Sequence, residues 1–157
     1  MDISMESIVI QSDINNLTAV ECFIDHICDE WHINNYMATI TMSVLQAVEN
    51  AVKHGNACDA EKKVIVSCDS CKGGLSFSVK DEGKGFDYEN FSISSPKAMD
   101  ATGIFLMKSL SDNLIFSEGG SRVTMDFMIS GIESLRAIER MSTLRRFYAD
   151  KLVRNLT

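Results

Sequence analysis

The chain has 157 residues, enough for one domain with a substantial buried core, and its 45% hydrophobic and 24% charged residues are ordinary for a globular protein. Its net charge of -7, without a basic block before the C-terminal segment, argues against nucleic acid as the main partner, because phosphate binding needs clustered lysine and arginine. No apolar run approaches the roughly 20 residues that span a bilayer, and the first residues lack the pattern of a signal peptide. We therefore expect a cytoplasmic protein that does not use a membrane.

The five cysteines are an odd number without framework spacing, which indicates reduced thiols. Cys68 and Cys71 form a CxxC pair, but no second pair is spaced to complete a structural zinc site, and the pair leads into a Gly-Gly turn instead of a helix. Cys22 and His26 share a predicted helix face, yet two ligands do not make a metal site. We favour a structural role for all of them.

The N-terminal third is predicted to form one strand and two helices. Residues 7–11 are a short β-prone run and the expected edge strand. Apolar residues at three- and four-residue steps predict an amphipathic helix from Ile14 to Trp31 and a second one from about Tyr36 to His54. Gly55 is placed to end the second helix in a left-handed cap.

The second helix carries a polar pair on one face. Gln46 and Asn50 lie four residues apart, so they sit one turn above each other on a helix otherwise rich in alanine, valine and leucine. Taken alone, this stretch fits a solvated or self-satisfied polar face better than a binding site.

Two β-hairpins are predicted further along the chain. Their turns are the sequences Lys72-Gly73-Gly74 and Glu118-Gly119-Gly120-Ser121. Their strands are residues 63–68, 75–80, 113–117 and 122–128.

A loop and two more helices complete the expected elements. Residues 88–100 have no clear period and form a candidate lid. A short helix over 102–110 follows this loop. A last helix over 132–156 has an apolar stripe that fits either packing on its own domain or contact with a partner.

Two motifs in this half carry binding chemistry. Asp81 directly follows a predicted strand, and Gly83 and Gly85 after it let the backbone turn tightly and a ligand approach closely. The motif is neither a Walker loop, which ends in Lys-Ser/Thr, nor a Rossmann fingerprint, which opens a helix. At Thr102-Gly103 a helix start offers free N–H groups and the positive end of the helix dipole, which favour phosphate.

In chain order, the set of motifs resembles the GHKL (Bergerat-fold) ATPases, the superfamily of gyrase B, Hsp90 and the histidine-kinase ATP domains. Within it, the short length and single compact lid are most similar to the anti-sigma-factor serine kinases of bacteria. The resemblance covers roughly residues 5–128. It implies an α/β (α+β) two-layer sandwich, in which helices cover one face of a mixed, mostly antiparallel sheet. Residues 1–130 would form the histidine kinase-like ATPase domain and residues 131–157 a helical extension.

The resemblance also implies a site for ATP and Mg²⁺. Asn50 matches the asparagine that binds Mg²⁺ bridging the phosphates, and Asp81 matches the acid that receives the adenine amino group. Gly103 matches the second glycine of the lid motif, and Ser121 stands where the family has a threonine near the adenine. The other residues expected at the nucleotide are Lys53, His54, Gly83, Gly85, Phe86, Thr102, Ile104 and Phe105.

Two positions depart from the family pattern. The family's general-base glutamate is Gln46 here, and an amide cannot take a proton at neutral pH, so general-base catalysis should fall by a factor of about 10² or more. Glu49 is the candidate replacement, although it lies about 100° from Asn50 around the helix. Ala101 replaces the first glycine of the lid's Gly-x-Gly, which makes that turn less permissive.

The resemblance implies an ATP-binding anti-sigma-type regulator. Its expected partners are a sigma factor and an anti-anti-sigma (STAS-type) protein, with weak serine kinase activity toward the latter. The alternative is a non-catalytic binding module that a nucleotide switches through the order of its lid. A third reading, the ATP domain of a two-component histidine kinase, would need a dimerisation helix pair before Met5. A homodimer is a further assembly that the resemblance allows.

Overall fold

The computed structural model describes residues 5–88, 101–129, 140 and 142–151. The candidate lid therefore lies outside the described residues apart from Tyr88, and so do residues 132–139, 141 and 152–156 of the predicted last helix. The side chain of Thr102 is also outside the described part.

Five strands form one sheet in the order β1-β2-β3-β5-β4, and each neighbouring pair is antiparallel. The strands are β1 (Glu6–Gln11), β2 (Lys63–Cys71), β3 (Gly74–Lys80), β4 (Asn113–Ser117) and β5 (Arg122–Met128). Each predicted strand is confirmed, with β1 at an edge as expected. In the described part of the chain, the expected mostly antiparallel sheet is antiparallel throughout.

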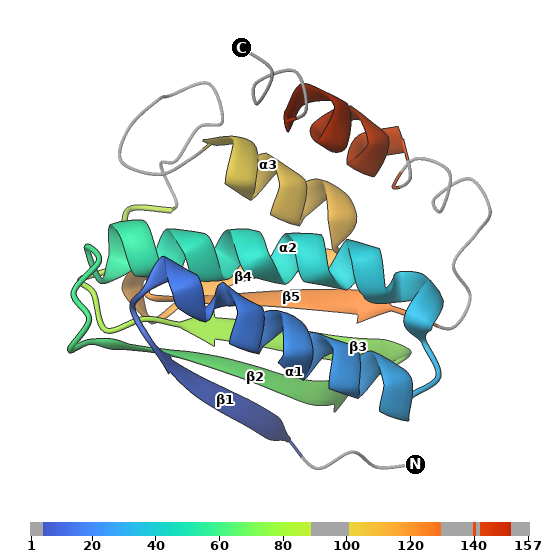
Figure 1. Cartoon of the computed structure of the whole chain (residues 1–157), viewed down its shortest axis with the longest axis horizontal. Helices are drawn as coiled ribbons and strands as arrows, with labels where there is room; N and C mark the ends of the chain where they lie inside the picture. Colours follow the sequence, from blue (N-terminus) through green and yellow to red (C-terminus); the bar gives the residue numbers. More distant parts are fainter. Residues whose placement is uncertain (1–4, 89–100, 130–139, 141, 152–157) are drawn as a thin grey trace.

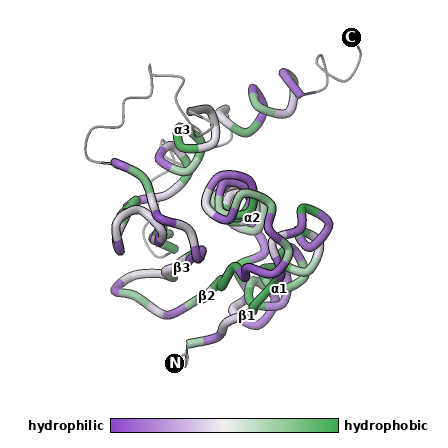
Figure 2. The backbone as a smooth tube through the Cα atoms, turned by 90° about the vertical axis from the view of Figure 1, so that its left-hand side faces the viewer, coloured by the Kyte–Doolittle hydropathy of each residue, from purple (hydrophilic) through white to green (hydrophobic). Residues whose placement is uncertain are grey.

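Three helices, α1 (Leu17–Glu30), α2 (Met37–Asn50) and α3 (Ala101–Leu110), cover one face of this sheet (Figure 1). Figure 2 shows α2 between α1 and α3, over the strands. The two-layer α+β architecture is thus confirmed. Among the described residues, no helix is both long and apolar enough to cross a membrane.

The main core lies between α1, α2 and the inner face of the sheet. Alternate residues of the central strands point into it, as the period of two requires. Its fully buried large side chains include Ile24, Ile27, Val44, Val48, Leu75, Phe77, Met125 and Phe127. Cys68 is also part of this core, and burial raises the pKa of its thiol to about 12. The thiolate that metal or redox chemistry at the CxxC pair would need is therefore strongly disfavoured.

The end of α2 differs from the prediction. The chain continues past Asn50 as a π-helical turn, Ala51–Gly55, and turns through Ala57 and Cys58, which have φ values of 51° and 59°. The left-handed cap predicted at Gly55 is wrong, because Gly55 is not among the described glycines with positive φ. The glycine has a different purpose: a Cβ atom there would overlap the carboxylate of Asp81.

A further helical segment, comprising residues 140 and 142–151, lies beside α3 (Figure 1). Its Leu144 is buried against α2 and α3 of the same chain. The described part of the predicted last helix therefore packs on its own domain, which was the first of the two interpretations of its apolar stripe.

Candidate functional site

Residues from α2, β3, α3 and the β4–β5 hairpin meet at a small cavity. Three of the predicted site residues line it: Asn50, Asp81 and Ser121. Its other lining residues are Ala47, Ala51, Val79, Met107, Phe116, Gly120 and Val123. The cavity measures about 20 Å³, which is room for about one water molecule. Within the described residues, this cavity is smaller than a purine ring.

Asp81 supplies a carboxylate to the cavity wall and is only 7% exposed. Its backbone N–H donates to the carbonyl of Ser121 at 2.9 Å, which fixes the loop after β3 to the β4–β5 hairpin. Its Oδ1 accepts the N–H of Gly83 at 2.8 Å. In the described residues this leaves Oδ2 as the acceptor for a ligand.

Burial raises the pKa of the Asp81 carboxyl, and the opposing effects of the Gly83 N–H and of Lys62 do not cancel this. The carboxyl of Asp81 therefore has a higher pKa in the folded chain than in the unfolded chain. At a pH between these two pKa values, Asp81 is protonated in the folded chain and ionised in the unfolded chain. Raising the pH through this window therefore favours the unfolded chain.

We expect the free energy of unfolding of the wild type to fall relative to that of Asp81→Asn as the pH rises from about 4 through the raised pKa. Urea titrations of both chains at several pH values would measure the difference. If the difference stays constant across this range, the carboxyl of Asp81 is not destabilised by burial.

The glycines of the Asp-x-Gly-x-Gly loop allow close contact between backbones. A Cβ atom at Gly83 would overlap the carbonyl of Gly55, and one at Gly85, where φ is 78°, would overlap the carbonyl of Gly119. The N–H of Phe86 donates to the same Gly119 carbonyl at 3.0 Å. The space that these two glycines leave is thus filled by neighbouring chain, which locks the loop of Asp81 against the end of α2 and against the β4–β5 turn.

Asn50 lines the same cavity from α2 and is 4% exposed. Its Nδ2 is a buried side-chain nitrogen without a hydrogen-bond partner among the described residues. Leaving such a group unsatisfied costs about 1–3 kcal/mol, so an orphaned amide in a cavity indicates a group kept for a ligand. The amide oxygen of the same side chain is a ligand type that Mg²⁺ accepts.

The first turn of α3 lies directly over the polar pair of α2. A Cβ atom at Gly103 would stand 3.0 Å from Gln46 Oε1 and 3.4 Å from Asn50 Nδ2, so the backbone of Gly103 is close to both amides. The amide nitrogen of Gln46 faces the sulfur of Met42 at 4.0 Å. The structure therefore brings together the predicted base position, the predicted metal ligand and the predicted phosphate-binding helix start.

Several predicted site residues lie elsewhere. Glu49 of α2 forms an ion pair with Lys53 of the following π-helical turn, and neither lines the cavity. His54 and Phe105 are exposed, whereas Ile104 is buried in the main core. These side chains do not face the cavity in this structure.

Phe86 reaches the neighbourhood of the site through an aromatic contact. Its ring packs edge-on against Phe116, which lines the cavity, with ring centroids 5.1 Å apart. Tyr88 stacks on the ring of Phe116, with ring centroids 5.6 Å apart.

The Oγ atom of Ser121 donates to the carbonyl of Glu118 at 2.9 Å, so this hydroxyl helps to hold the β4–β5 turn.

Asn56 is a buried organising residue that the sequence interpretation missed. Its amide nitrogen donates to Ser12 Oγ at 2.7 Å and to the Lys63 carbonyl at 2.9 Å, and its amide oxygen accepts the N–H of Glu82 at 2.8 Å. These bonds tie the end of α2 to the residue after Asp81. The only signal in the sequence was a polar residue directly after Gly55, which is equally common at an exposed helix end.

A profile of the histidine kinase-like ATPase domain matches residues 10–127, which include every element around the cavity. This chain belongs to that family. Its relatives include the anti-sigma F factors of three Clostridium perfringens strains (SM101, ATCC 13124 and 13), each 31% identical over 98 residues that cover 57% of this chain and 70% of the relative. The resemblance to the GHKL ATPases and to their anti-sigma-factor branch is thereby confirmed. Membership implies that the chain binds ATP.

Proposed function

We propose that this chain is an ATP-dependent regulator of the anti-sigma type, which binds ATP with Mg²⁺ between Asn50 and Asp81 and binds a sigma factor in a nucleotide-dependent way. The observation that carries the proposal is the orphaned amide of Asn50 in the same cavity as the buried carboxylate of Asp81. The anti-sigma F relatives support the choice of a sigma factor as partner. A homodimer stays a prediction from the resemblance.

Each part of the nucleotide would meet a chemically matched group. Asp81 Oδ2 would accept a hydrogen bond from the adenine amino group, because Oδ1 already accepts the backbone N–H of Gly83. The oxygen of the Asn50 amide would hold Mg²⁺, which neutralises phosphate charge when it is bound. The N–H groups at the start of α3, next to Gly103, would face the phosphates.

The residues near the expected position of the ATP phosphates favour a slow phosphoryl transfer. Gln46 stands where a kinase of this family needs a proton acceptor, and Glu49 is engaged with Lys53 outside the cavity. Positioning and electrostatic stabilisation still supply most of a phosphoryl transfer. We therefore propose a weak serine kinase acting on a STAS-type partner, and the second candidate function is a nucleotide-switched binding module without catalysis.

Nucleotide-dependent capture of a sigma factor tests the regulatory part of this proposal. With the full chain immobilised, we expect a sigma factor of the source organism to bind about 10-fold more tightly with ATP and Mg²⁺ than without nucleotide, a typical coupling between two sites. The Asn50→Ala chain should lose this difference. Equal binding in all nucleotide states, or no binding of any sigma factor of that organism, would contradict the regulatory role.

A further inference from the structure

Three metal-ligating side chains meet where the edge strand β1 lies against α1. They are Glu6 of β1 and His26 and Glu30 of α1, and none of them lines the cavity of Asn50 and Asp81. One ligand atom of each side chain lies within 4.8 Å of the ligand atoms of the other two. Among the described residues, no other group of three histidine, cysteine, aspartate or glutamate side chains comes this close together.

The path of the chain brings these side chains together. His26 and Glu30 are four residues apart, so they lie one turn from each other on one face of α1. The helix runs back along β1, and its last turns return to the beginning of the strand, where Glu6 lies (Figure 1). The cluster therefore takes its ligands from two different elements of the fold.

The distances within the cluster fit a zinc ion. Zn²⁺ forms bonds of about 2.0–2.2 Å to imidazole nitrogen and carboxylate oxygen, so two of its ligands in a tetrahedral arrangement lie about 3.4 Å apart. His26 Nε2 and Glu30 Oε2 are already 3.6 Å apart. Glu6 is partly exposed and the other two residues are exposed, so side-chain rotation can close the remaining distance. An imidazole suits Zn²⁺, whereas Mg²⁺ prefers oxygen ligands alone.

The charge of the cluster also favours a divalent cation. An ion pair on the helix surface would need His26 and Glu30 only, and such exposed pairs contribute little to stability. Glu6 brings a second carboxylate to the same imidazole, so the two negative charges exceed the single charge that a protonated histidine can supply. A Zn²⁺ ion beside a neutral imidazole would balance both carboxylates.

We propose that Glu6, His26 and Glu30 bind a Zn²⁺ ion that joins β1 to α1, with a water molecule in the fourth position. This site is separate from the proposed ATP–Mg²⁺ site and does not depend on it. Cys22, which shares a helix face with His26, is not a member of the cluster. The ligands of His26 come instead from the next turn of α1 and from the neighbouring strand.

NMR spectra of the histidine imidazoles test the site directly in the full chain without nucleotide. The chain has three histidines, so His32 and His54 serve as internal references. We expect a single equivalent of Zn²⁺ to shift the signals of His26 before those of the other two, and Mg²⁺ to leave all three unchanged. No response of His26, or a response of all three histidines together, would overturn the site.

Glu6→Gln tests whether the ion joins the two elements. In the same titration it should weaken the binding of Zn²⁺ at His26 by at least about 10-fold, since the loss of even an outer partner of a metal ligand costs about 10–100-fold. Glu21→Gln is the matched control, because it removes a carboxylate from an exposed position of α1 outside the cluster and should bind Zn²⁺ like the wild type. Wild-type affinity in Glu6→Gln would contradict the proposal and leave the proposed function standing.

Discussion

Replacing Asp81 with asparagine is expected to weaken ATP binding by about 100-fold or more. The new amide side chain would keep the acceptor for the Gly83 N–H through its oxygen, so its NH₂ group would take the position of Oδ2. Two donors would then face each other where the adenine amino group should bind. The loss of a hydrogen bond to a charged group, about 1.5–3 kcal/mol, adds to this mismatch. Calorimetric titration with ATP and Mg²⁺ would measure the change.

Glu61→Gln is the matched control for this change, because it removes a carboxylate at an exposed position of the loop before β2. It should bind ATP like the wild type. Circular dichroism would show that the Asp81→Asn chain is folded, which the retained bond from Gly83 leads us to expect. If the folded Asp81→Asn chain binds ATP with wild-type affinity, the adenine does not contact this residue.

Replacing Gln46 with glutamate is expected to accelerate phosphate transfer from ATP to a STAS-type protein by about 10²-fold or more. The change puts a proton acceptor at the position where Gln46 Oε1 already lies beside Gly103 and one turn from Asn50. General-base catalysis typically contributes factors of about 10²–10⁴. Incubation with radiolabelled ATP, Mg²⁺ and the partner would measure the rate in both chains.

The two candidate functions predict different rates for the wild type in this assay. Slow but measurable transfer supports the weak kinase, and transfer by the Gln46→Glu chain alone supports the binding module. The double change Gln46→Glu with Asn50→Ala is the control and should abolish transfer, because the metal ligand is lost. A wild-type chain that is as fast as Gln46→Glu would show that position 46 does not limit the chemistry, and Glu49→Gln would then test the alternative base.

Local patterns in the sequence predicted the helices and strands around the candidate site well. The period of the apolar residues located α1 and α2, and the Gly-rich turns located both hairpins, because these features depend on neighbours a few residues apart. The four-residue spacing of Gln46 and Asn50 correctly put both side chains on one face, and that face lies beside the start of α3. The order of the motifs along the chain then sufficed to indicate the family.

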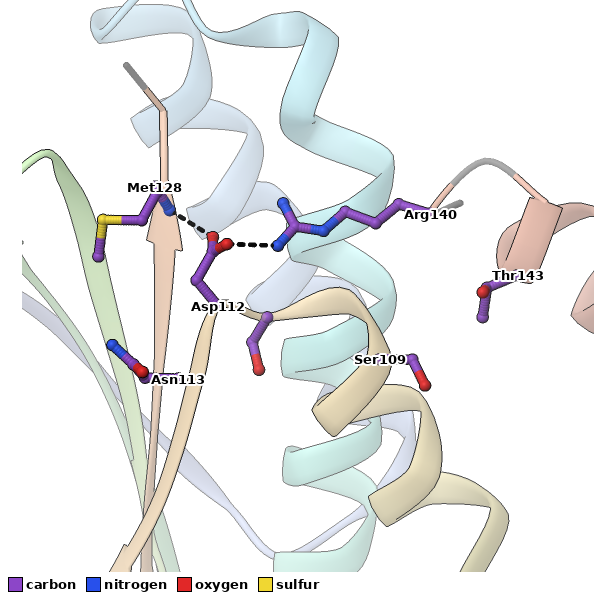
Figure 3. Close-up of a pocket in the computed structure, with 7 residues that line it drawn as sticks. Ser109, Asp112, Asn113, Met128, Arg140 and Thr143 are labelled. Atoms are coloured by element: carbon purple, nitrogen blue, oxygen red, sulfur yellow. Dashed lines mark hydrogen bonds and ion pairs between the residues drawn. The ribbon is translucent and has the colours of Figure 1, made fainter. Parts of the chain in front are cut away.

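What the sequence could not show are contacts between distant segments. Gly55 had the position of a helix cap, but its lack of a side chain makes room for Asp81, which is 26 residues away. The bonds of Asn56 and the ion pair between Arg140 and Asp112 (Figure 3) likewise join segments far apart in the chain. The closeness of Gly103 to Gln46 and Asn50 depends on how α3 packs against α2, and no local pattern encodes that packing.

The most direct test of the assigned site is calorimetric titration of the full wild-type chain with ATP, with Mg²⁺ and again after the metal is removed by a chelator. We expect one molecule of ATP to bind per chain, with an affinity that falls by at least about 10-fold without the metal, since Asn50 would hold Mg²⁺ against the phosphates. The Asn50→Ala chain should show the weaker affinity under both conditions. Absence of ATP binding, or an affinity that neither Mg²⁺ nor Asn50 changes, would contradict the assignment of this cavity as the ATP–Mg²⁺ site.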